Sequence, residues 1–143
     1  MERPFTPSRP EPVRILIVDD DRHARAGVRA FLASTFNCTI VGEAGNGREA
    51  ITQVESHRPD AVVLDLHMPV LGGLEAARII KTQWPETAIV VLTMYTEHRV
   101  AAVSAGVDAF VCKGDPPATL LEALRGAVQR VGSQGAEDNE LRS

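Results

Sequence analysis

Short apolar runs alternate with amphipathic stretches along most of this 143-residue chain. Each run is continuous and rich in β-branched and aliphatic side chains, a pattern typical of parallel strands that are buried on both faces. The pattern therefore predicts five strands. They cover residues 13–18, 38–44, 61–64, 88–93 and 109–112.

Between these runs, apolar residues recur every three or four positions, which predicts five helices. The first should cover residues 22–34, and a later one, starting at Thr96, should end near Gly106 as a left-handed stop. Asn46 and Glu49 form a capping-box-like pair before the second helix. Pro85 should stop the third helix. Asp115, followed by Pro116, should start a last helix that reaches Val131.

Five strands alternating with five helices predict an α/β fold with a parallel sheet and right-handed crossovers. Helices should flank the sheet on both faces. The strand order 2-1-3-4-5 of flavodoxin-like folds would bring strands one, three and four together. Alternation alone does not determine this order, so the order is an inference from the fold class.

The two ends of the chain differ from its middle. Residues 1–12 contain four prolines and are expected to form a flexible arm. Residues 132–143 are polar and lack an apolar period, so they are interpreted as a tail or the start of a linker. One domain, residues 13–131, is expected between them.

Composition and charge exclude some functions for this portion. The net charge of -4 argues against a nucleic-acid surface, so nucleic acid would be bound only through a domain not present in this chain. No apolar run is long enough to span a membrane, and no secretory signal is visible. Cys38 and Cys112 lie in strand-like runs and are interpreted as core thiols of a cytoplasmic protein.

Charged side chains stand where the predicted strands end. Asp19, Asp20 and Asp21 follow the first run, Asp65 follows the third, and Lys113 follows the fifth. Ligands of such sheets bind outside the carboxyl ends of the strands. Crowded carboxylates repel one another unless a cation joins them, and Mg²⁺ prefers oxygen ligands. The pattern therefore predicts a magnesium site beside an acceptor aspartate.

In order along the chain, these residues resemble the receiver domain of a two-component response regulator. The resemblance covers residues 13–131 and rests on five motifs at strand ends. The matching residues are Asp19 with Asp20, Asp65 in the stretch Asp-Leu-His-Met-Pro, Gly73, Thr93 and Lys113.

The resemblance implies that a histidine kinase phosphorylates Asp65. It also implies that Asp20, Asp65 and the backbone carbonyl of His67 bind Mg²⁺, with Asp19 acting through a coordinated water. Lys113 would pair with Asp65 and then meet a phosphoryl oxygen. A receiver assists its own phosphorylation and dephosphorylation, so no turnover of an external substrate is expected.

The resemblance to the receiver family also implies a two-state switch. The hydroxyl of Thr93 would bind the phosphoryl group, and Phe110 would turn inward to fill the space that Thr93 leaves. This would reshape the surface formed by helix four, strand five and helix five. A partner, or a homodimer through that surface or through helices one and five, would read the change. Phe110 lacks the hydroxyl of the tyrosine usual in the family.

Details of the motifs suggest a subclass. Gly114 after Lys113, together with residues 92–95, resembles NarL-type regulators, whose members carry a C-terminal helix-turn-helix. The third acid, Asp21, would either cap the first helix or add a water-mediated metal contact. His67 and Tyr95 would flank the path of water to an acyl phosphate.

Three alternatives remain at this point. The chain could be the receiver fragment of a helix-turn-helix transcription regulator, or a receiver-shaped scaffold that no longer accepts phosphate. A haloacid-dehalogenase-like phosphatase would need a second acid two residues after the nucleophile, where this chain has His67. The four histidines show no paired metal-ligand spacing; they are His23, His57, His67 and His98.

Overall fold

The computed structural model describes residues 11–142, and for residues 133–142 it describes the backbone alone. Its centre is one five-stranded parallel sheet in the order β2-β1-β3-β4-β5, which confirms both the predicted fold class and the predicted order. The strands are β1 (Val13–Val18), β2 (Cys38–Ala44), β3 (Ala61–Leu64), β4 (Ala88–Thr93) and β5 (Ala109–Cys112).

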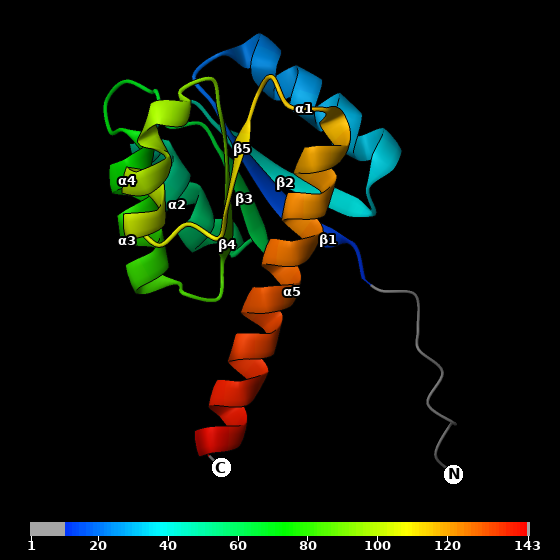
Figure 1. Cartoon of the computed structure of the whole chain (residues 1–143), viewed down its shortest axis with the longest axis vertical. Coiled ribbons are helices and arrows are strands. Elements are labelled where there is room, and N and C mark those ends of the chain that lie inside the picture. Colours follow the sequence, from blue (N-terminus) through cyan, green and yellow to red (C-terminus); the bar gives the residue numbers. More distant parts are fainter. Residues whose placement is uncertain (1–10, 143) are drawn as a thin grey trace.

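Helices cover both faces of the sheet (Figure 1), with α1 and α5 on one face and α2, α3 and α4 on the other. A short 3₁₀ turn, η1 (Thr96–His98), leads into α4. The helices are α1 (Arg22–Thr35), α2 (Gly47–His57), α3 (Gly73–Gln83), α4 (Arg99–Ser104) and α5 (Pro117–Arg142).

Successive strand residues face opposite sides of the sheet, and this alternation builds two main apolar cores. Ile17 packs in one core with Leu32 of α1 and Leu124 of α5. Leu16 packs in the other with Ile80 of α3. Because both sides are covered, β3 is apolar at every position, and β1 and β4 depart from this only at Arg14 and Thr93.

The predicted helix starts at Asp21 and Asn46 are confirmed. The carboxylate of Asp21 accepts a hydrogen bond from the backbone N–H of His23 at 2.8 Å, so Asp21 caps α1. The side chain of Asn46 accepts from the N–H of Glu49 at 2.9 Å, and the Glu49 carboxylate accepts from the N–H of Gly45 at 2.8 Å. These bonds satisfy N–H groups that a helix leaves free in its first turn.

Gly106 ends α4 as predicted. Its φ of 93° is left-handed, its N–H donates to the carbonyl of Val103, and the N–H of Val107 donates to that of Ala102. Together these are the two hydrogen bonds of a Schellman motif, which glycine adopts at little cost. The stretch expected to be one helix from Thr96 begins as the 3₁₀ turn η1.

The bounds of α5 differ from those predicted. The helix begins at Pro117, and the carboxylate of Asp115 accepts from the N–H of Cys112 at 3.0 Å instead of capping α5. The helix also continues past Val131 to Arg142, although a polar tail or linker was expected there. Glycine in a helix costs about 1 kcal/mol and does not end it. Most of the expected N-terminal arm, residues 1–10, lies outside the described residues, as does residue 143.

The structure also bears on the expectations about the cysteines and about membrane spans. Cys38 and Cys112 are free thiols and only partly buried, and burial raises the pKa of the Cys38 thiol. Within residues 11–142, no helix combines the length and the apolar character that crossing a bilayer requires.

Candidate functional site

The ends of β1 and β3 bring acidic residues from distant parts of the chain together. Val18 and Leu64, the last residues of these strands, are paired across the parallel ladder. The next residues extend the pairing, because the N–H of Asp65 donates to the carbonyl of Val18 at 2.9 Å. Asp19 and Asp65 therefore emerge side by side at the carboxyl edge of the sheet, as predicted.

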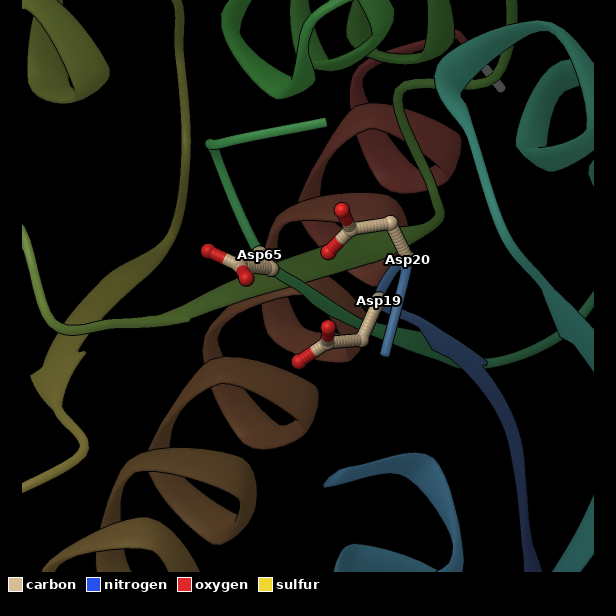
Figure 2. Close-up of side chains that lie close together, drawn as sticks. All are labelled: Asp19, Asp20 and Asp65. Carbon is tan, nitrogen blue, oxygen red and sulfur yellow. The ribbon is translucent and has the colours of Figure 1, made fainter. Parts of the chain in front are cut away.

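Three carboxylates converge at this edge (Figure 2). Oxygen atoms of Asp19, Asp20 and Asp65 all lie within 4.8 Å of one another. Asp19 and Asp65 are buried, with 5% and 7% of their surface exposed, whereas Asp20 is exposed. Oxygen ligands at this spacing fit a hard divalent cation such as Mg²⁺, which would also relieve their mutual repulsion.

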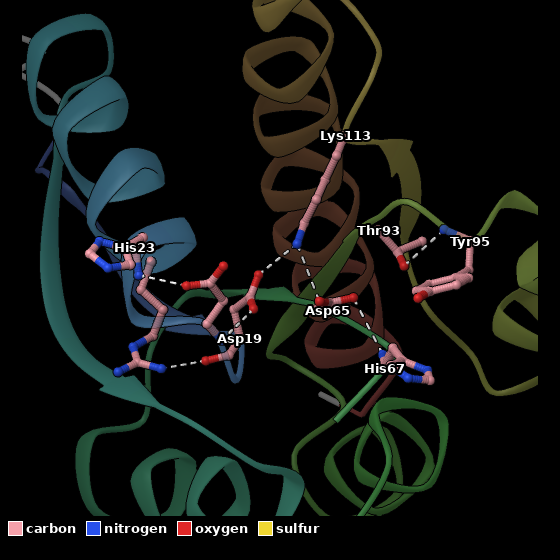
Figure 3. A network of polar contacts seen from close by, with 9 residues as sticks. Asp19, His23, Asp65, His67, Thr93, Tyr95 and Lys113 are labelled. Atoms are coloured by element: carbon pink, nitrogen blue, oxygen red, sulfur yellow. Dashed lines mark hydrogen bonds and ion pairs between the residues drawn. The ribbon is translucent and has the colours of Figure 1, made fainter. Parts of the chain in front are cut away.

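Lys113, directly after β5, supplies a positive charge to the same cluster (Figure 3). Its Nζ donates to Oδ2 of Asp19 at 2.8 Å and to Oδ2 of Asp65 at 3.2 Å. Burial lowers the pKa of Lys113, but the hydrogen bond to Asp19 and the charges of Asp65 and Asp19 outweigh it, so the pKa is raised. The ammonium therefore stays charged near neutral pH, which is the form that can meet a phosphoryl oxygen.

The other side of Asp65 is lined by the loops after β3 and β4. The backbone N–H of His67 donates to Oδ1 of Asp65 at 3.3 Å. The hydroxyl of Thr93, which is fully buried, accepts from the N–H of Tyr95 at 3.2 Å. The ring centres of His67 and Tyr95 lie 4.8 Å apart, so the rings form a tilted pair next to Asp65 (Figure 3).

Phe110 lies on β5, on the side of α4. It is partly buried against the small cluster of Leu66, Val91 and Ala102. The guanidinium of Arg99 in α4 lies 5.0 Å from the centre of its ring, a cation–π distance. The residue expected to act as the switch thus touches α4, the element whose surface should change.

Sequence reasoning missed Arg25 and Glu43. Arg25, on α1, donates to the backbone carbonyl of Asp19 and forms an ion pair at 3.0 Å with Glu43 of β2. The available signal was Glu43, the only charged residue in β2. Charged side chains are rarely buried without a partner, so Glu43 predicted a cation nearby.

Comparison with known proteins identifies the class. The family model of the response regulator receiver domain matches residues 15–125, most of the chain. The chain therefore belongs to the response regulator receiver domain family. The match indicates no enzymatic family, so it favours the receiver over the phosphatase considered above.

Two curated relatives and one solved structure agree with this assignment. The chain is 38% identical over 112 residues to the uncharacterized transcriptional regulatory protein YhcZ of Bacillus subtilis, covering 77% of this chain and 52% of YhcZ. It is 43% identical over 121 residues to the response regulator MprA of Mycolicibacterium vanbaalenii, covering 83% of this chain and 52% of MprA. The chain thus spans about half the length of the curated relatives it matches.

A LuxR-family two-component response regulator from Aurantimonas sp. has the same fold. Its crystal structure superposes with a TM-score of 0.79 at 29% identity and covers 90% of this chain and 99% of its own. This similarity confirms the flavodoxin-like receiver fold. Because the relatives are NarL/LuxR-type response regulators, it also supports the predicted NarL-type subclass.

Proposed function

We propose that this receiver accepts a phosphoryl group on Asp65 from a histidine kinase, in a reaction that depends on Mg²⁺. One observation carries the proposal. Carboxylate oxygens of three residues at the ends of β1 and β3 lie within 4.8 Å of one another, and Lys113, at the end of β5, donates to Asp65. Structural ion pairs alone need no exposed acid such as Asp20 beside two buried ones. Phosphoryl transfer needs this kind of positioning and charge neutralisation.

Asp65 is the nucleophile of the proposed step. One carboxylate oxygen of Asp65 forms a bond to phosphorus while the bond from phosphorus to the kinase histidine nitrogen breaks, and the imidazole leaves. Asp20, Asp65 and the carbonyl of His67 would bind Mg²⁺, with Asp19 holding a coordinated water. When bound, the ion neutralises charge on the phosphoryl oxygens. Lys113 would neutralise charge on another phosphoryl oxygen.

Thr93 and Phe110 carry the switch in this proposal. The Thr93 hydroxyl accepts from the N–H of Tyr95, and its own O–H is the donor that would meet a phosphoryl oxygen once the side chain moves toward Asp65. Because Thr93 is fully buried, its movement leaves a space that a neighbouring side chain fills. Phe110 would move inward and leave Arg99, changing the surface of α4, β5 and α5.

The chain spans about half the length of the curated relatives it matches, and we propose its output from the surface of the receiver itself. The changed surface would bind a partner or a second copy, through α4, β5 and α5 or through α1 and α5. DNA would be bound only through a further domain, such as the helix-turn-helix of NarL-type regulators. We expect a cytoplasmic protein that turns over no external substrate.

Acetyl phosphate with Mg²⁺ tests the proposal without the kinase. Intact-mass measurement should show one added phosphoryl group on the parent protein, lost on chelation of Mg²⁺, and none on the Asp65→Asn variant. Equal mass shifts in both proteins would contradict the assignment of Asp65. An unmodified parent that still binds Mg²⁺ would favour the inactive scaffold, and hydrolysis of p-nitrophenyl phosphate would favour a phosphatase.

A further inference from the structure

Arg25 is a nearly buried cation next to the acidic cluster, and the proposed chemistry does not use it. Its side chain is only 16% exposed. Nη1 donates to the backbone carbonyl of Asp19, and Nε donates to Oε1 of Glu43 at 3.0 Å. The guanidinium thus connects three elements: α1, the end of β1, and β2.

The bonded carbonyl belongs to the peptide unit that joins Asp19 to Asp20. A peptide unit is planar, so a donor that fixes its oxygen also fixes the direction of the N–Cα bond of Asp20. The side chain of Asp20 needs this support. It is exposed, and no side chain described in residues 11–132 and no backbone group described in residues 11–142 donates a hydrogen bond to its carboxylate.

The other acids of the cluster are held by direct contacts. Asp19 accepts from the N–H of Asp21 at 2.9 Å and from Lys113, and Asp65 accepts from Lys113 and the N–H of His67. The direction of the Asp20 side chain depends on its backbone alone. The group that orients this backbone therefore helps to determine whether the three carboxylates can share an ion.

The charge of Arg25 does not oppose this role. A cation near a metal site repels the metal, but Glu43 pairs with the guanidinium at 3.0 Å and offsets its charge. Glu43 is held in turn by its place on β2, paired with Ile17 of β1. It also accepts from Arg29 at 2.6 Å.

We propose that Arg25 is a positioning residue, which orients the Asp19–Asp20 peptide so that Asp20 can bind Mg²⁺. The proposal rests on the metal-dependent phosphorylation proposed above. Partners that orient metal ligands without touching the metal typically contribute about 10- to 100-fold in affinity. Arg25 makes no contact with Asp65 in the described residues, so it should affect metal binding and leave the chemical step unchanged.

The Arg25→Met variant tests this, because methionine keeps an unbranched apolar stem and removes the donors. Calorimetric titration with MgCl₂ gives the Kd, and phosphorylation by acetyl phosphate is followed at increasing Mg²⁺ concentration. We expect the Kd and the half-saturating Mg²⁺ concentration to rise about tenfold or more. The rate at saturating Mg²⁺ should stay within about twofold of the parent. A damaged fold would lower that rate and the unfolding midpoint together.

Arg29→Met is the matched control. Arg29 lies on the same helix and pairs with the same glutamate, but it makes no contact with Asp19. Its Kd for Mg²⁺ should match that of the parent. Arg25→Lys, whose ammonium can still donate to the carbonyl, should recover part of the affinity even if the methionine variant does not fold.

Three results would overturn the proposal: an unchanged or tighter Kd in Arg25→Met, an equal loss in Arg29→Met, or a lysine variant as weak as the methionine one. Failure of the proposed function is distinguishable from these, because the parent protein itself would then bind no Mg²⁺ or accept no phosphoryl group.

Discussion

The backbone of Gly73, at the start of α3, packs directly against the carbonyl group of Asp65. A Cβ atom at position 73 would lie 2.4 Å from that oxygen and 2.6 Å from Cα of Leu66. Both neighbours are backbone atoms, which cannot swing aside as a side chain can. The close approach lets the N–H of Gly73 donate to the carbonyl of Leu66, and this bond fixes the start of α3 against the segment that follows β3.

We therefore expect Gly73→Ala to destabilise the fold by roughly 1–3 kcal/mol, as overpacking does, and to weaken Mg²⁺ binding by displacing Asp65. Urea unfolding and calorimetric titration measure the two effects. Gly27→Ala is the matched control, because Gly27 lies inside α1 with nothing within 4 Å of an added Cβ. Alanine there should stabilise by about 0.5–1 kcal/mol. Equal stabilities of the two variants would refute the steric argument.

Asp20→Asn should separate metal binding from folding. Without metal, the variant should be more stable by roughly 1 kcal/mol, because it removes a like charge within 4.8 Å of two others. The parent should gain thermal stability with MgCl₂, and this gain should shrink or vanish in the variant. Asp21→Asn is the control, since asparagine caps a helix as well as aspartate. A full Mg²⁺ response in Asp20→Asn would exclude that residue as a ligand.

Lys113 should make stability depend on alkaline pH. Its pKa is raised in the folded protein: burial lowers it, but the hydrogen bond to Asp19 and the charges of Asp65 and Asp19 more than compensate. The resulting stability is complete below the unfolded pKa of about 10.4 and is lost as pH rises through the higher folded value. Urea unfolding between pH 8 and 12 should show a steeper loss for the parent than for Lys113→Met. Parallel curves would contradict this coupling.

The aromatic pair of His67 and Tyr95 should protect the acyl phosphate from water. Replacing either ring by alanine opens one side of Asp65, so phosphate release after phosphorylation should become several-fold faster. The double variant should gain less than the product of the two single effects, because residues in contact act together. His57→Ala, at the last residue of α2, serves as the control. Unchanged release rates in both single variants would remove the pair from this role.

Strand positions could be predicted from the sequence because each strand is a short run of mostly apolar residues. The caps at Asp21 and Asn46 could be predicted for a similar reason, since each depends on a few neighbouring residues. The predicted start of α5 was wrong because the carboxylate of Asp115 could accept from an N–H group in the first turn of α5 or from the N–H of Cys112. In the structure it accepts from Cys112. Local spacing cannot decide between such competitors.

The acids of the site could be predicted because parallel strands end at one edge of the sheet. The contact between Arg25 and the Asp19 carbonyl could not, since a backbone acceptor leaves no trace in the residue pattern. The orientation of Thr93 toward the N–H of Tyr95 was equally invisible. Apart from the carbonyl of His67, the roles inferred from the resemblance belong to side chains, whereas these two contacts involve the main chain.

Because β5 lies at the edge of the sheet, it has a single neighbouring strand, β4, and a ladder of only four residue pairs. Lys113, just beyond that ladder, reaches over β4 and β3 to Asp19 at the end of β1. The side chain thus works as a tether that anchors the outermost strand to the centre. Because Lys113 also pairs with Asp65, a change of charge on that carboxylate would act directly on the attachment of β5 to the centre of the sheet.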